Sequence, residues 1–158
     1  MKRTTPTRGP SVVSMQIAKQ LAIFLENKPG MLARVCDALA EHNINIYALT
    51  TSDTVDHTVI RMVVSDYRKA LHVFEERGTL VVEDDVLLVE GRNQPGSLAT
   101  IAHALGDAGV NIEYAYCATA PGQQKGLLVL RVRDVAKALK VLNLQTTRTT
   151  PAHRPAGN

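Results

Sequence analysis

The sequence predicts an α+β protein built from two copies of one structural unit, and two observations predict this fold class. The stretch ENKPGMLARVCDALAEHNINI, residues 26–46, returns as GRNQPGSLATIAHALGDAGVNI, residues 91–112. At an offset of 66, nine of the twenty positions from 27 to 46 are identical. The same order of strand-like and helix-like segments then follows each copy, which is typical of an internal repeat.

In the first copy, the strand-like segment QLAIFLEN, residues 20–27, ends at the turn pair Pro29-Gly30. A helix is expected after the turn in both copies. The apolar residues that recur there at helical spacing are Leu32, Val35, Cys36 and Leu39, and then Leu98, Ile101, Ala102 and Leu105. Asn43 and Gly109 are expected to end these helices, because both residue types tolerate the left-handed conformation.

The rest of the first copy reads as two strands, residues 43–51 and 57–65, a second helix and a short last strand, residues 80–83. Asp66 is expected to cap the second helix, which runs to about Arg77 and is stopped by Gly78. The six residues from Asp66, DYRKAL, return as DVAKAL from Asp134. Residues 86–91 open the second copy.

The resulting order, βαββαβ, is that of a ferredoxin-like unit, in which both helices pack on one face of a four-stranded antiparallel sheet. In the second copy the last strand falls on LQTTRTT, residues 144–150, a weak strand segment. We expect that strand to be absent or to be replaced by a strand from elsewhere.

The central strands are apolar on both faces. VIRMVV, residues 59–64, and GLLVLRV, residues 126–132, are interrupted only by Arg61 and Arg131. A sheet with water on one face should alternate instead. We therefore expect the open faces to pack together, between the two copies or between chains, and we expect an oligomer, such as a homodimer.

The positive charge of the chain belongs to its ends. The net charge is +3, but residues 15–144 carry thirteen basic and all fifteen acidic residues. We expect residues 1–14 and 145–158 to be disordered tails, residues 15–84 to form the first repeat and residues 85–144 the second. A net-acidic core argues against a nucleic-acid partner.

No window approaches the roughly 20 apolar residues that span a membrane, and two cysteines without a disulfide framework predict a cytoplasmic protein.

The Asn-x-Pro-Gly turn is a candidate ligand site. Pro suits the first turn of a helix, and Gly allows a close approach of a ligand. The N–H groups of Gly30, Met31 and Leu32 lie at the positive end of the helix dipole, where a carboxylate or phosphate binds readily. Asn27 adds a donor and an acceptor. This combination suits the zwitterion of an α-amino acid, although an Asn beside such a turn is commonly only a turn residue.

The repeated pattern, strand, Asn-x-Pro-Gly-x-Leu-Ala, helix, Asn-Ile, strand, resembles the ACT domain family, and the stretch from about Gln16 to Leu142 resembles a tandem ACT protein. This resemblance implies a regulatory protein that binds a small amino acid at interfaces between paired units. The implied ligand-binding residues are Asn27, Gly30, Met31, Leu32, Asn45, Ile46, Asn93, Gly96, Ser97, Leu98, Asn111 and Ile112. The copies differ at Met31 against Ser97 and at Tyr47 against Glu113, so their pockets need not be equivalent.

Neither an enzyme nor a metal site is expected. The five histidines show no ligand spacing, Cys36 lies in a helix stripe, Cys117 has no evident His partner, and no cofactor motif is present. Any regulated metabolic enzyme is then a separate chain. The alternative reading is a regulatory subunit that resembles the small subunit of acetolactate synthase and acts by protein contact. Few aromatic residues also argue against RNA recognition, which needs exposed rings for stacking.

Overall fold

A computed structural model describes residues 11–148, with side-chain surroundings to residue 144. The chain divides into two compact units. Unit 2 spans Ile17–Val86, and unit 1 combines the described residues before Ile17 with those after Val86. Strands β1 (Val12–Glu26) and β4 (Leu80–Arg92) each contribute one part to either unit.

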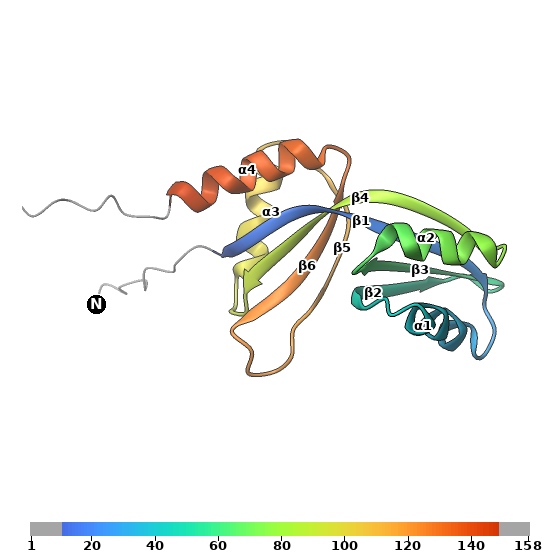
Figure 1. Cartoon of the computed structure of the whole chain (residues 1–158). Helices are drawn as coiled ribbons and strands as arrows, with labels where there is room; N and C mark the ends of the chain where they lie inside the picture. The colour runs from blue at the N-terminus through green and yellow to red at the C-terminus, as the bar shows by residue number, and fades with distance from the viewer. Residues whose placement is uncertain (1–10, 149–158) are drawn as a thin grey trace, which may run out of the picture. The chain divides into compact units, whose positions relative to one another are not determined.

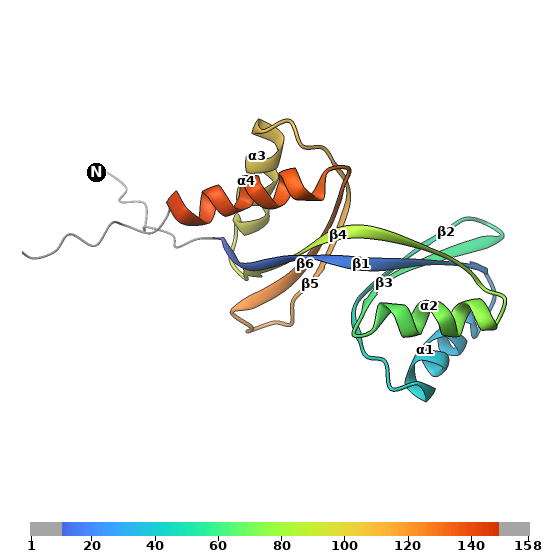
Figure 2. The ribbon, with the colours of Figure 1, turned by 45° about the horizontal axis from the view of Figure 1, so that its top comes forward.

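Unit 2 is the first repeat. Its sheet has the order β2-β3-β1-β4, with β2 (Ile46–Asp53) and β3 (His57–Val64) antiparallel to one another and β3 antiparallel to β1. In the β1–β3 register Leu21 lies opposite Met62. Helices α1 (Met31–Glu41) and α2 (Tyr67–Glu76), labelled in Figure 1, lie on the same side of these strands in Figure 2.

The core of unit 2 forms between those helices and the sheet. Both helices bury a stripe, and the facing strand residues alternate at the period of a pleated strand. The buried cluster consists of Leu21, Ile23, Val35, Ala38, Leu39, Ile44, Ile60, Met62, Val64, Ala70, Val73 and Phe74. The helices therefore cover one face of the sheet, as the ferredoxin-like prediction requires.

Unit 1 is the second repeat, with the sheet order β1-β4-β6-β5. It contains α3 (Ser97–Asp107), β5 (Ile112–Ala118), β6 (Lys125–Val132) and α4 (Val135–Arg148). The helices α3 and α4 lie on one face of the strands in Figure 2, and both contribute to a single buried cluster with β4 and β6.

The last strand of unit 1 comes from the start of the chain. Val12 is 6% exposed and belongs to the core of unit 1, and the Arg92 N–H donates to the Ser11 carbonyl oxygen at 2.9 Å. Of the two outcomes expected for this strand, replacement from elsewhere is confirmed. The weak segment that begins at Leu144 instead continues helix α4 as far as Arg148.

Two expectations about the tails need correction. Residues 12–14 belong to β1 rather than to a tail, because strand pairing beside β4 satisfies their backbone groups. Residues 145–148 belong to α4. The expected disorder of residues 1–10 and 149–158 concerns residues that lie outside the described part of the chain.

Local signals for helix ends are confirmed. Asp66 Oδ1 accepts from the Lys69 N–H at 3.0 Å, which is the expected cap of α2. Asn43, at φ 55°, and Gly78 and Gly109, at 69° and 70°, take the left-handed conformation just after their helices.

Burial on both faces of the central strands is also observed, since Val63 and Val129 are 3% and 0% exposed beside the core residues Met62 and Leu130.

The apolar stripes of α1 and α3 differ from the prediction in their first turns. Val35, Leu39, Ile101 and Leu105 are buried, but Leu32 and Leu98 are 44% and 49% exposed. Each leucine lies one turn before the first buried apolar residue of its helix. Cys36 is only half-buried and Ala102 is exposed, because the buried face runs through Ala38 and Ala104 instead.

Candidate functional site

The two Asn-x-Pro-Gly turns have the same backbone geometry. Gly30 and Gly96, at φ 83° and 87°, stand in the left-handed conformation immediately before α1 and α3. An L-residue with a side chain is strained there, so the glycine is required by the turn. Neither helix has a side-chain cap at this end. We call the first turns of α1 and α3 the first and second openings.

Asn27 and Asn93 hold these turns against the loop that connects the next two strands. The Asn27 N–H donates to the Asp56 carbonyl oxygen at 3.0 Å, and its Nδ2 donates to the Thr54 carbonyl oxygen at 3.2 Å. Asn93 repeats the arrangement with Gln124 and Gln123, at 2.8 Å and 2.6 Å. Each side-chain amide therefore has a structural role, because its Nδ2 fixes the turn to the neighbouring loop.

The available amide donors lie one residue further along than predicted. The N–H groups of Met31 and Ser97 close the turn, donating to the carbonyl oxygens of Lys28 at 3.4 Å and Gln94 at 3.2 Å. They are not orphan donors, because the turn itself supplies their acceptors.

The i→i−4 bonding of each helix begins four residues after its left-handed glycine, where the N–H groups of Arg34 and Thr100 donate to the carbonyl oxygens of Gly30 and Gly96. Within the described chain, the N–H groups in between have no backbone acceptor. These are the amides of Leu32 and Ala33 at the first opening and of Leu98 and Ala99 at the second. Two adjacent free N–H groups at a helix N-terminus suit an anionic oxygen.

The predicted Asn-Ile pairs stand at the entry to β2 and β5. The Asn45 N–H donates to Ser65 Oγ at 3.0 Å, and the Ser65 N–H returns a bond to the Asn45 carbonyl oxygen at 2.9 Å. Asn111 is exposed at the equivalent place. Ile46 and Ile112 pack against the core of their own units. Their contribution to a ligand pocket of a neighbouring unit stays a prediction.

A cavity of about 160 Å³ lies at the second opening, entirely within unit 1. Its walls come from the end of β4, the first turns of α3, and strands β5 and β6. The lining residues are Gly91, Arg92, Asn93, Gln94, Ser97, Leu98, Ile101, Cys117, Thr119, Gly126, Leu127 and Leu128. Ser97 is 8% exposed, and its Oγ has no hydrogen-bond partner among the described residues. Sequence reasoning identified Ser97 only for its N–H and missed the hydroxyl.

The first opening differs in shape and charge. The cavity that reaches Met31, of about 290 Å³, lies between α1 and α2 and includes Arg34 and Phe74 among its walls. Before the turn, Glu26 pairs with Lys28, and this ion pair lowers the pKa of the Glu26 carboxyl. In the second copy Arg92 replaces Glu26, and Gln94 and Thr100 replace Lys28 and Arg34, so the two openings carry their charges at different positions.

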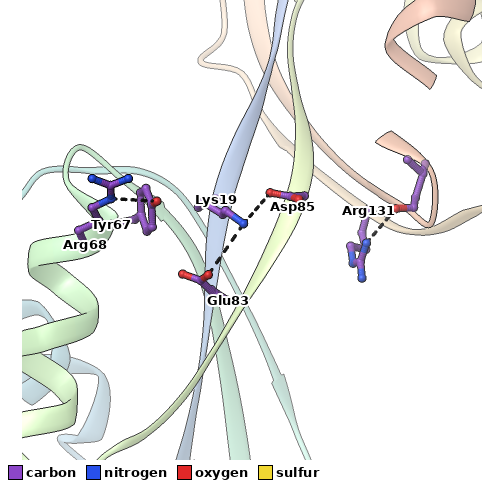
Figure 3. A network of polar contacts seen from close by, with 7 residues as sticks. Lys19, Tyr67, Arg68, Glu83, Asp85 and Arg131 are labelled. Atoms are coloured by element: carbon purple, nitrogen blue, oxygen red, sulfur yellow. Dashed lines mark hydrogen bonds and ion pairs between the residues drawn. The ribbon is translucent and has the colours of Figure 1, made fainter. Parts of the chain in front are cut away.

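A separate ion-pair cluster bridges β1 and β4 in unit 2. Lys19 Nζ lies 3.0 Å from Asp85 Oδ1 and 3.9 Å from Glu83 Oε1 (Figure 3). The hydrogen bond to Asp85 raises the pKa of Lys19 above its ordinary value. The cluster contains one cation and two anions beside the sheet, and it contributes no residue to either opening.

No metal-binding group of three or more His, Cys, Asp and Glu side chains occurs among the described residues. Cys36 and Cys117 are free thiols. In the same part of the chain, no helix has the length and hydropathy needed to cross a membrane.

The chain is similar to several solved structures. It aligns with protein BT0572 from Bacteroides thetaiotaomicron at a TM-score of 0.77 and 36% identity, over 83% of this chain and 90% of that one. It aligns at 20% identity, over 85% of its length and 98% of theirs, with the regulatory subunits of aspartate kinase from Thermus thermophilus and Thermus flavus, at TM-scores of 0.62 and 0.59. At 20% identity, the alignments with the two Thermus structures show a shared fold. No match to this chain is found among the curated proteins.

The family model described as an ACT domain pair matches residues 15–149. This range includes the four helices α1 to α4, both left-handed glycine turns and both helix openings. The match over most of the chain agrees with the fold and with the repeated turns, and the chain therefore belongs to the ACT domain pair family.

Proposed function

We propose that this ACT domain pair is a non-catalytic regulatory protein that binds a small amino acid at its helix openings and regulates a separate metabolic enzyme. The observation that carries the proposal is the pair of free N–H groups, those of Leu98 and Ala99, beside the cavity of about 160 Å³ at the second opening. A ligand carboxylate there is stabilised by the helix dipole and by two donors.

The fold supports the regulatory part of the proposal. The structures from Thermus thermophilus and Thermus flavus, which share this fold, are described as regulatory subunits of aspartate kinase. A regulatory subunit that is its own chain fits a protein of two ACT repeats. The enzyme that this chain regulates is then also a separate polypeptide, and both free cysteines fit a cytoplasmic setting.

The openings fit an interface with a second copy of the chain. Leu32 and Leu98, identical in the two repeats, are 44% and 49% exposed beside the openings. Because these two leucines occupy equivalent places, a second copy of the chain could cover both openings through the same kind of apolar contact. We propose a homodimer in which the partner copy closes each opening, and the ligand then stabilises the closed arrangement by its differential affinity.

A thermal-shift panel of the twenty amino acids tests the binding proposal. A ligand present at 100 times its Kd adds about 2.7 kcal/mol to the free energy of unfolding, and the melting temperature rises accordingly. We expect at least one amino acid to raise it. A panel in which none of the twenty does so contradicts amino-acid sensing.

The same exposed leucines also favour the second candidate function, a regulatory subunit that acts by protein contact alone, like the small subunit of acetolactate synthase. The double variant Leu32→Ser with Leu98→Ser should weaken assembly of the chain with its second copy, which sedimentation-velocity ultracentrifugation measures. If the wild-type protein assembles but binds no amino acid, and the double variant does not assemble, then regulation by protein contact is the better account.

A further inference from the structure

The buried hydroxyl of Ser97 sets the second opening apart. Ser97 is the first residue of α3, its side chain is 8% exposed, and its Oγ has no hydrogen-bond partner within the described chain. Most buried polar side-chain atoms in proteins do have a partner. A buried hydroxyl without one destabilises the fold, because it loses its bonds to water and gains none in return.

Ser97 is one of the residues that line the cavity of about 160 Å³, and its Oγ is buried at that wall. Leu98, Ile101, Leu127 and Leu128 give that cavity an apolar wall. The free N–H groups of α3 begin directly after Ser97. One small region therefore combines two backbone donors, a hydroxyl that can donate or accept, and an apolar surface, which is typical of a small-molecule site.

The first opening does not offer the same groups. Met31 stands where Ser97 stands in the second copy, and its Sδ lies 4.0 Å from Arg34 Nη1. A thioether is at best a weak acceptor and cannot donate a hydrogen bond. The second opening therefore offers a ligand a hydrogen-bonding hydroxyl that the first opening lacks.

We propose that the second repeat holds the ligand, that Ser97 Oγ hydrogen-bonds to it, and that the ligand is a small α-amino acid whose side chain carries no positive charge. This inference rests on the proposed function and narrows it to one opening and one ligand class. The lining residues include Arg92 but no Asp or Glu, so a lysine or arginine side chain would find no counter-ion there.

Calorimetric titration of the full chain with the twenty amino acids, on wild type and on Ser97 variants, tests the proposal. Ser97→Ala should weaken binding of the preferred amino acid about tenfold, the equivalent of one hydrogen bond of about 1.4 kcal/mol. The same variant should raise the melting temperature of the unliganded protein, since it removes an unpaired buried hydroxyl. A purely structural serine does not produce this opposite pair of effects.

Two further variants complete the series. Ser97→Met, which copies the first repeat, should abolish binding, and Ser14→Ala, at an exposed position of β1, is the matched control and should leave binding and melting temperature unchanged. Circular dichroism of each variant checks that the fold is kept.

Thiol modification locates the ligand without any mutation. Cys117 is exposed and lines the cavity, whereas Cys36 lies in α1 of the other unit. A saturating concentration of the preferred amino acid should slow the reaction of Cys117 with a maleimide several-fold and leave that of Cys36 unchanged.

The failures of the two proposals are distinguishable. If wild type binds none of the twenty amino acids, the proposed function itself is overturned. If an amino acid binds but Ser97→Ala and Ser97→Met bind it equally well, or if Cys117 is not protected, the amino-acid sensor stands and its assignment to the second opening is wrong. Preferential binding of lysine or arginine overturns the ligand class.

Discussion

The side-chain amide of Asn93 donates from Nδ2 to the carbonyl oxygen of Gln123 at 2.6 Å, and so ties the opening of α3 to the loop between β5 and β6. Asn27 makes the same bond to Thr54 in the first repeat, at 3.2 Å. The asparagine that the repeats share therefore sets the position of the opening relative to the neighbouring strands. This role explains its recurrence in both copies before any ligand is considered.

Asn93→Ala should lower the free energy of unfolding by about 1 kcal/mol, because the carbonyl oxygen of Gln123 loses its donor at an exposed site. Urea denaturation measures the change. Gln123→Ala is the matched control, since it keeps the backbone carbonyl and should leave stability nearly unchanged. Equal stability of wild type and Asn93→Ala would contradict the structural role of the amide.

Val12→Ala should destabilise the protein by about 1–2 kcal/mol, because two methyl groups leave the core of unit 1. Val13→Ala, one residue along β1 and 41% exposed, is its control and should change stability by less than about 0.5 kcal/mol. The comparison, made by chemical denaturation, tests whether the start of the chain completes the second repeat. Equal effects of the two substitutions would show that it does not.

Gly96→Ala should cost about 1–2 kcal/mol, because alanine is strained at the left-handed φ of 87°. Gly106, inside α3, meets nothing within 4 Å when a Cβ is added. Gly106→Ala should therefore stabilise the protein by about 0.5–1 kcal/mol through its higher helix propensity. Melting temperatures should move in opposite directions for the two variants, and a shift in the same direction would refute the assignment of strain to Gly96.

Asp66→Ala and Asp134→Ala should each cost about 1 kcal/mol, because each removes an oxygen that caps the following helix. Asp66 Oδ1 accepts from the Lys69 N–H at 3.0 Å, and Asp134 Oδ1 accepts from the Lys137 N–H at 2.9 Å. Asparagine at either position retains a capping oxygen and should recover most of the loss. Thermal denaturation of the four variants makes the comparison, and failure of asparagine to restore stability would argue against capping.

Stability should fall at alkaline pH as Lys19 loses its proton. The hydrogen bond to Asp85 raises the pKa of Lys19 in the folded protein, so the ion pairs stabilise the fold fully below the unfolded-state pKa of about 10.4 and lose their effect as the pH rises through the folded-state value. The difference in unfolding free energy between wild type and Lys19→Met should therefore shrink between about pH 9 and pH 12. A difference that does not change with pH would show that Lys19 contributes only by packing.

The repeat and the ends of the helices could be read from the sequence because they depend on neighbours along the chain. Pro29-Gly30 ends a strand and starts a helix, Asp66 caps α2, and Asn43 takes a left-handed φ of 55°, all as predicted. Each of these features rests on a residue type and on contacts within a few positions, which a sequence states directly.

The positions of Leu32 and Leu98 were less predictable. Helical periodicity places both leucines on the apolar stripe, yet both are exposed in the first turn of their helices. Periodicity identifies a face of a helix, but it does not say how far the partner surface extends along that face. The extent of the sheet that packs against each helix decides how many turns of that helix are buried.

The sequence by itself determined that the chain holds two ferredoxin-like ACT units, and where their turns and caps lie, because these are short-range patterns written twice. Only the tertiary structure decided that Val12 completes the sheet of the second repeat. It also decided that Ser97 Oγ is buried beside a cavity and has no hydrogen-bond partner among the residues that the structure describes. Both depend on pairings between residues far apart in the chain. Such pairings are selected by the burial and hydrogen bonding of the whole fold, and no local pattern encodes them.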